Sequence, residues 1–287
     1  MAAVLGTNVA SLWASKNLQS AQSNMANSVE RLSSGLRINR ARDDAAGLGI
    51  ANALTQQINS ADQGIRNLND GISVVQTAEG ALAQVTEMAQ RILTLSIQGT
   101  NGALSSDQKT SITSEMTRLL NGIDAIQART KFGSSTASLL SGSSISVYSS
   151  KESTDSIVIT ATALASFTTG TTAANGGAAT LNSSVSAAIS STTVANFQSI
   201  TTAVSSYITA LDTQRGLLGA TQNQMEYSVN NITELSANLS SARSRVIDTD
   251  YATETAKLTK GQILQQAATA MLAQANQMPN VILSLLK

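Results

Sequence analysis

Apolar positions between residues 44 and 98 recur at alternating intervals of three and four, which is the period of a coiled-coil seam. The spacing predicts one long helix over residues 44–98, about 80 Å in length at 1.5 Å per residue. After Val75 the seam shifts by a three-residue step, a change that locally overwinds a supercoil. The seam residues are Ala51, Leu54, Ile58, Ala61, Ile65, Leu68, Ile72 and Val75, followed by Ala78, Leu82 and Val85.

Two further helices are predicted nearer the middle and the end of the chain. The stretch GTNGALSSDQ predicts a chain reversal, with Ser105 or Ser106 as the N-cap of the next helix. That helix should pack antiparallel on the first through Ile112, Met116, Leu119, Ile123 and Ile126. Helical spacing returns at Val194, with a seam of Val204, Ile208, Leu211, Leu218, Met225, Val229, Ile232 and Leu239. Polar residues at Arg215, Gln222 and Ser236 interrupt this seam and can fix its register at some cost in stability.

The middle of the chain has a different character, because Ser and Thr supply nearly half of residues 133–193. Ile145 and Val147 alternate with polar residues, as do Ile157 and Ile159, and a polar turn separates the two runs. This pattern predicts a β-hairpin inside a tolerant surface insertion. The many hydroxyls are also possible acceptors for O-linked sugars.

Both ends of the chain are predicted to be helices stripped of charge. Lys16 is the only charged residue before Glu30, and residues 261–286 carry none. We expect the two ends to pair through an apolar seam that also serves assembly. The predicted seam consists of Met25, Val29, Leu32, Leu36, Leu264, Ala268, Met271, Ala275, Met278, Ile282 and Leu285.

Composition excludes several functional classes. Charged residues make up 13% of the chain, about half the usual share, and the net charge is zero, so neither nucleic acid nor an anionic membrane is an expected partner. The absence of Cys and His removes disulfides, the commonest metal ligands and the commonest general base. We therefore expect no catalytic, cofactor-binding or metal-binding residues.

The start of the chain does not resemble a secretory signal peptide, and the amides near the C-terminus argue against a transmembrane helix. Because few surface residues are charged, the surface of this protein should lose its water at low cost when subunits assemble.

Two terminal motifs identify a family resemblance. ERLSSGLRINRARDDAAGLGIA (residues 30–51) and AQANQMPNVILSLLK (residues 273–287) resemble the two ends of bacterial flagellins. The resemblance implies a secreted, extracellular, non-enzymatic subunit of the helical flagellar filament, whose main partner is itself. It also implies an export chaperone on the C-terminal helix, and contacts with filament cap and hook-associated proteins.

The resemblance and the helical spacing together predict a mainly α protein. We expect an elongated rod of long antiparallel coiled-coil helices formed by both chain ends, with a small β-hairpin-containing insertion. Residues 1–43 and 244–287 would form inner-tube helices, residues 44–141 and 192–243 a helical rod domain, and residues 142–191 a variable surface segment.

The resemblance also assigns two charged regions. Arg37, Arg40, Arg42, Asp43 and Asp44 lie where flagellins pass from inner tube to outer rod, so they are candidates for ion pairs at that junction, or for a solvated helix start. In EMAQRILTLSIQ, a patch of Gln90, Arg91, Leu95 and Gln98, with Glu115 on the next helix, is similar to the flagellin surface that a host Toll-like receptor reads. Arg91, Leu95 and Gln98 are expected to share one helical face.

Three alternatives are weighed against a filament subunit. A hook–filament junction protein has similar terminal helices and is the nearest rival. A zinc-protease insertion would need His, which this chain lacks. A signalling or pore-forming coiled-coil protein would need a ligand domain or a membrane segment.

Overall fold

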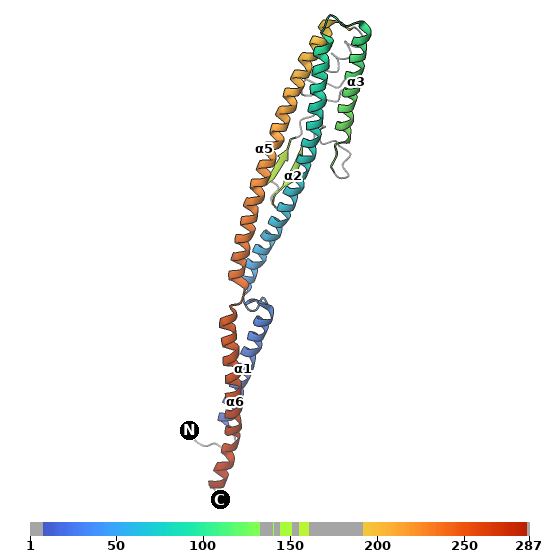
Figure 1. Ribbon diagram of the computed structural model, residues 1–287. Helices are drawn as coiled ribbons and strands as arrows, with labels where there is room; N and C mark the ends of the chain where they lie inside the picture. Colours follow the sequence, from blue (N-terminus) through green and yellow to red (C-terminus); the bar gives the residue numbers. More distant parts are fainter. Residues whose placement is uncertain (1–7, 133–139, 141–143, 151–154, 161–191, 286–287) are drawn as a thin grey trace. The chain divides into compact units, whose positions relative to one another are not determined.

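A computed structural model describes residues 8–132, 140, 144–150, 155–160 and 192–285, with side chains up to residue 277. The described residues form long helices and one β-hairpin (Figure 1), so the prediction of a mainly α fold with a small hairpin in the middle is confirmed. The elements are α1 (Val9–Ser34), α2 (Ala45–Gly99), α3 (Ser106–Arg129), β1 (Ile145–Tyr148), β2 (Ser156–Ile159), α5 (Val194–Ile247) and α6 (Tyr251–Leu285).

The helix α2 begins and ends within one residue of its predicted bounds. It starts where the Asp44 carboxylate accepts a hydrogen bond of 2.8 Å from the Gly47 amide, an N-terminal cap that satisfies a donor the helix cannot pair itself. Its buried positions follow the predicted seam through the three-residue step, because Val75, Ala78, Leu82 and Val85 are all buried.

The chain divides into two compact units. The first consists of Met1–Ile58 and Ala237–Lys287, and the second of Asn59–Ser236. Both boundaries fall inside the helices α2 and α5. The three-part division expected from the sequence places its boundaries in other positions and stays a prediction.

The core of the second unit lies among α2, α3, α5 and the hairpin. Its fully buried side chains include Leu82 from α2, Met116 from α3, and Phe197 and Tyr207 from α5. Helix α3 starts with a capping box, in which the Ser105 hydroxyl accepts from the Gln108 amide and the Gln108 side chain accepts from the Ser105 amide. This confirms the N-cap expected at Ser105 or Ser106.

Two of the polar residues that interrupt the α5 seam find polar partners on α2. Arg215 lies 3.8 Å from Glu79, and the Ser236 hydroxyl donates to Asp62 at 3.2 Å. Since low residue numbers on α2 meet high numbers on α5, the two helices run antiparallel. A seam position that keeps a polar partner favours one alignment over shifted ones.

The hairpin has the register that its alternation predicts. Ile145 pairs with Ile159, and Val147 pairs with Ile157. The buried side chains of Val147, Ile157 and Ile159 join the core, which anchors this part of the middle segment to the helices. Residues 151–154, which include Lys151 and Glu152, and residues 161–191 lie outside the described residues.

Candidate assembly surface

In the first unit, α1 and α6 pack along each other through small side chains. The buried positions fall on a seven-residue repeat on both helices, the spacing of one edge of a coiled-coil seam, although Ala268 on α6 is only half-buried. They are Ala14, Ala21 and Ser28 on α1, and Glu254, Gly261 and Ala275 on α6. Small side chains let the two helix backbones approach closely.

Specific contacts fix the direction of this helix pair. The Asn8 amide donates to the Ala275 carbonyl at 2.7 Å, and a β-carbon on Gly261 would lie 3.5 Å from the β-carbon of Met25. Because the start of α1 meets the far part of α6, the helices are antiparallel. The two chain ends therefore form one structural element, as the sequence predicted.

Some described members of the predicted seam are covered within the single chain, and others are exposed. Met25, Leu32, Ala268 and Ala275 are buried or half-buried. Leu36 is also half-buried, and it packs on a separate cluster of Ile38, Ala51 and Ile247. The side chains of Met278, Ile282 and Leu285 lie outside the described residues.

Val29, Leu264 and Met271, which the predicted seam includes, are not buried between α1 and α6 within a single chain, and their place in the seam stays a prediction. Their exposed fractions are 49%, 47% and 65%. The buried part of the contact runs along the neighbouring line of Ala, Ser and Gly residues, whose small side chains let the two backbones approach each other.

An apolar groove runs between α1 and α6 on the exposed side. Trp13 from α1 and Leu264 and Met271 from α6 line it, and Trp13 is 60% exposed. Leu12 and Ile263 are more than 60% exposed on the same helices. A single chain thus leaves large apolar side chains uncovered, which is typical of a surface used for association.

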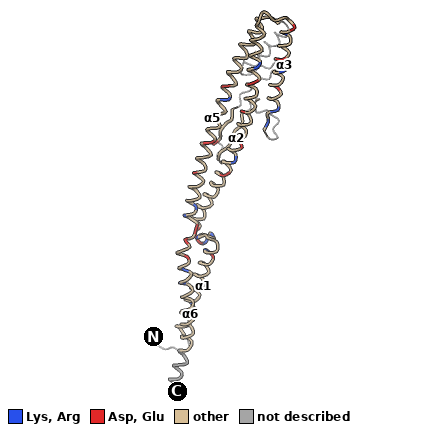
Figure 2. Tube along the Cα trace, viewed as in Figure 1, with Lys and Arg blue, Asp and Glu red and all other residues tan. Residues whose placement is uncertain are grey.

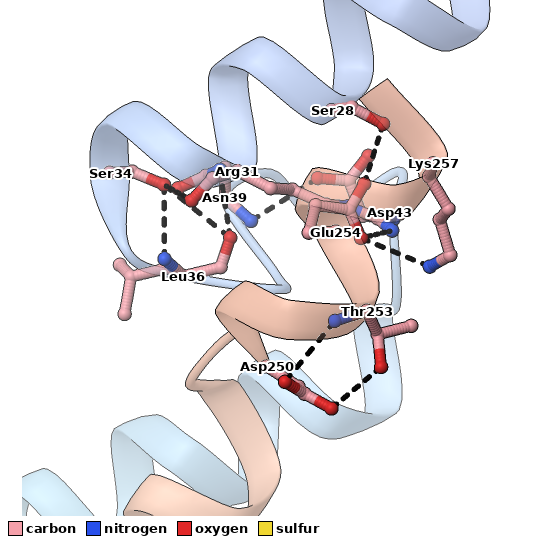
Figure 3. A network of polar contacts seen from close by, with 10 residues as sticks. All are labelled: Ser28, Arg31, Ser34, Leu36, Asn39, Asp43, Asp250, Thr253, Glu254 and Lys257. Atoms are coloured by element: carbon pink, nitrogen blue, oxygen red, sulfur yellow. Dashed lines mark hydrogen bonds and ion pairs between the residues drawn. The ribbon is translucent and has the colours of Figure 1, made fainter. Parts of the chain in front are cut away.

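A buried carboxylate lies near the opposite end of this helix pair. Glu254 Oε1 accepts from the Ser28 hydroxyl at 2.7 Å, and Oε2 accepts from the Lys257 ammonium at 3.0 Å. The Arg31 guanidinium lies 3.9 Å from the same carboxylate. Figure 3 shows Ser28 and Arg31 from α1 and Lys257 from α6 converging on Glu254.

The pKa of Glu254 is lowered by its hydrogen-bond and charge partners more than it is raised by burial. Burial alone would raise the pKa of this carboxyl. The hydrogen bonds from Ser28 and Lys257 and the charges of Lys257 and Arg31 lower it by a larger amount, so the pKa lies below its usual value. Glu254 is therefore ionised at neutral pH. Glu254 was not predicted from the sequence, although it falls on the same seven-residue repeat as Gly261, Ala268 and Ala275.

Charged side chains gather where α1 ends and α6 begins, whereas the far parts of both helices are nearly free of them (Figure 2). Arg40 pairs with Glu30 at 2.8 Å, and Arg42 lies 3.7 Å from Asp43. The Arg37 guanidinium donates to the carbonyl of Val246. Asp44 caps α2, so the expected favourable place of an Asp near a helix start is confirmed for this residue.

Two exposed aspartates order the backbone in this region. Asp43 accepts from the amides of Arg40 and Asn39, and these bonds lower its pKa. Asp250 accepts from the Thr253 hydroxyl and amide at the start of α6, which lowers the pKa of Asp250 in the same way. The charged cluster therefore serves as a set of caps and short ion pairs within the chain.

The patch expected to resemble a receptor-binding surface is only partly exposed. Arg91 on α2 and Glu115 on α3 pair at 2.8 Å with both side chains about half exposed, and Gln90 and Gln98 are exposed. Leu95 is 2% exposed and belongs to the core, so the expectation that it shares the exposed face of Arg91 and Gln98 is wrong. It lies on the side of α2 that packs on the other helices.

The described residues offer neither a membrane-spanning helix nor a metal site. Among the described residues, no helix is long and apolar enough to cross a bilayer. In the same part of the chain, no cluster of three or more acidic residues could hold a metal ion.

Paired terminal helices with little charge and an uncovered apolar groove define a helical structural protein built for association. The family models for the bacterial flagellin N-terminal and C-terminal helical regions match residues 5–145 and 201–286. Polar flagellin F of Vibrio parahaemolyticus is 33% identical over 376 aligned positions, and flagellin B of Vibrio anguillarum 34% over 375, each match covering 100% of both chains. The crystal structure of Bacillus cereus flagellin is 23% identical with a TM-score of 0.47, covering 62% of this chain and 94% of that one.

The chain belongs to the bacterial flagellin family. It is accordingly a structural subunit of the flagellar filament, which self-assembles outside the cell. The relatives named above are flagellins, and none of them favours the alternative of a hook–filament junction protein.

Proposed function

We propose that subunits of the filament hold together mainly through the exposed apolar side of the α1–α6 pair. The observation that carries this proposal is the groove lined by Trp13, Leu264 and Met271, which a single chain leaves open. Val29 belongs to the same uncovered set. Met278, Ile282 and Leu285 extend the proposed surface on the basis of the sequence alone.

The scarcity of charge supports the same surface. Burying an unpaired charge between subunits is expensive, whereas apolar groups and neutral amides are desolvated at much lower cost. The stretch of α6 from Gly261 onward carries no charge, and α1 carries only Lys16 before Glu30. The Lys16 ammonium lies 5.3 Å from the centre of the Trp13 ring, which offsets part of its desolvation.

The charged cluster has a proposed second use between subunits. Arg37, Arg40, Arg42, Asp43 and Asp44 carry exposed or half-exposed charges beside the paired helices. In the filament, Arg37 and Arg42 would complete ion pairs with neighbouring subunits. Exposed ion pairs contribute little by themselves, about 0–1 kcal/mol each, so their effect would be on alignment more than on strength.

The proposed partners outside the filament follow from the same surfaces. An export chaperone would cover the apolar side of α6 before assembly, and a truncation after Lys260 should then lose affinity for it. Filament cap and hook-associated proteins would meet the paired helices at the two ends of the polymer. We expect no catalytic activity.

A host Toll-like receptor remains a proposed partner of the Arg91 patch. Arg91, Glu115, Gln90 and Gln98 offer polar groups at the surface of α2 and α3. Replacing Arg91 with Ala should weaken receptor signalling by the subunit, while filament assembly is retained. Undiminished signalling by Arg91→Ala would contradict the proposal that this patch binds the receptor.

The assembly surface is tested by Met271→Asp with Thr269→Asp as the matched control. Both positions are exposed on α6, but only Met271 lines the groove. A charge at Met271 should cost several kcal/mol per subunit in a desolvated interface, so filaments should be lost. Sedimentation and electron microscopy of purified subunits measure the outcome. Normal filaments from Met271→Asp would refute the proposed surface.

A further inference from the structure

Small buried residues repeat along the contact between α1 and α6, so their packing does not by itself fix how far one helix is shifted along the other. The buried positions on α1 before Ser28 are both alanines, Ala14 and Ala21. Those on α6 after Glu254 include Gly261 and Ala275, which differ by one methyl group. Sliding one helix by seven residues would place similar small side chains opposite each other, so packing alone does not choose between these alignments.

Backbone contacts near the helix ends constrain the alignment only at the junction between α1 and α6. The Arg37 amide donates to the Ile247 carbonyl, and the Thr249 amide donates to the Gly35 carbonyl. At the other end of the pair, the Asn8 side chain also reaches a carbonyl, that of Ala275. The first two bonds belong to a bridge between Leu36 and Asp248 that lies outside both helices, so they hold the junction, whereas the acceptor of Asn8 is a backbone group that every residue of α6 carries.

Two contacts across the pair join specific side chains, Ser11 with Asn276 and Glu254 with Ser28, but only that of Glu254 is buried and charged. In the observed alignment its carboxylate lies opposite the Ser28 hydroxyl and near the Arg31 guanidinium. A shift of seven residues toward the start of α1 would place it opposite Ala21, which has no donor. In the observed alignment its side chain is only 6% exposed, and in a shifted contact that buried it equally well water would not replace the lost donor.

We propose that Glu254 is the positioning residue of the terminal helix pair, and that its carboxylate, held by Ser28 and Arg31, fixes the axial register of α6 on α1. Lys257 completes the site from α6 itself and moves with Glu254, so it stabilises the charge without selecting the register. This role concerns the fold of the single chain and does not depend on which surface joins the subunits.

The absence of Cys allows a direct measurement of this register. The Ser11 hydroxyl lies 3.0 Å from the Asn276 side chain, far along both helices from Glu254. In the double variant Ser11→Cys with Asn276→Cys, the yield of disulfide under mild oxidation reports the native alignment. Circular dichroism of the same samples reports helix content. Both are measured on free subunits and on assembled filaments.

Three further substitutions are made in this background. Glu254→Leu should keep the helix content, because an apolar side chain in a buried seam replaces the lost ion pair, while the disulfide yield falls several-fold. Glu254→Gln keeps an acceptor for Ser28 and should retain most of the yield. Glu30→Gln is the control, because Glu30 is a surface carboxylate on α1 that pairs with Arg40.

Each contrary outcome overturns the proposal. An unchanged disulfide yield in Glu254→Leu would show that the register is set elsewhere. A parallel fall of yield and helix content would show that Glu254 only stabilises the pair. Absence of the disulfide in the parent double variant, in subunits and filaments alike, would contradict the alignment itself.

Discussion

Gly64 on α2 lies directly against the carbonyl oxygen of Ser149, and a β-carbon at Gly64 would be 1.9 Å from that oxygen. The hairpin is held at this point by the Asn67 side chain, which donates to the Tyr148 carbonyl at 3.0 Å. The glycine is therefore what allows the end of β1 to rest on the helix. Backbone atoms are involved on both sides, so the contact cannot relax by a change of rotamer.

Replacing Gly64 with Ala should destabilise the second unit by about 1–3 kcal/mol, because the hairpin must move away from α2. The matched control is Gly80→Ala, also within α2, where an added β-carbon meets no atom within 4 Å. That change should stabilise the helix by about 1 kcal/mol. Urea unfolding followed by circular dichroism measures both. Equal effects at the two positions would contradict the described docking of the hairpin.

Acid should weaken the pairing of α1 with α6 through Glu254. The pKa of Glu254 is lower in the folded chain than the ordinary 4.5, so the ionised group stabilises the pair at neutral pH. That contribution is lost as the pH falls below 4.5 and through the folded-state pKa. The emission of Trp13, the only tryptophan, reports α1 as the pH is lowered.

Glu254→Gln should reduce this acid transition, because an amide does not titrate, and should leave the part that comes from Asp43 and Asp250. Glu30→Gln should leave the contribution of Glu254 in place. Ser28→Ala removes a donor to the ionised carboxylate and should move the transition to higher pH. An acid profile of Glu254→Gln that superimposes on that of the parent protein would assign the transition to other carboxyls.

Tyr207 should ionise only when the second unit unfolds. Burial, and the nearby charge of Asp124, raise the pKa of Tyr207 above the ordinary 10.0. Its contribution to stability is complete below pH 10.0 and is lost as the pH rises through the raised value. A jump to alkaline pH should therefore give a delayed phase of tyrosinate absorbance, which Tyr207→Phe abolishes. A Tyr207→Phe variant that kept the slow phase would contradict this assignment.

Much of the second unit could be predicted from large apolar residues at regular intervals. The bounds of α2, the cap at Ser105 and the pairing of Val147 with Ile157 all follow from periodicity and turn chemistry. In each case a local pattern and the buried core favour the same structure. Leu95 was placed wrongly because spacing alone does not say which edge of a helical face turns toward the core.

The contact between α1 and α6 was harder to predict for a physical reason. A search for large apolar residues selects Val29, Leu264 and Met271, which the structure leaves exposed. The buried line consists of Ala, Ser and Gly, whose value lies in letting backbones approach. The signal that would have found Glu254 was its place in the repeat of Gly261 and Ala275.

Hydrogen exchange on free subunits and assembled filaments tests the central claim most directly, namely that the terminal helix pair is completed by neighbouring subunits. Within one chain this pair buries mainly small side chains, so it should open often in the free subunit. We predict that amides of α1 and α6 exchange quickly in subunits and become strongly protected in filaments, while α3 and the core of α2 are protected in both. Equal protection of α1 and α6 in the two states, or a gain confined to the hairpin, would contradict the account.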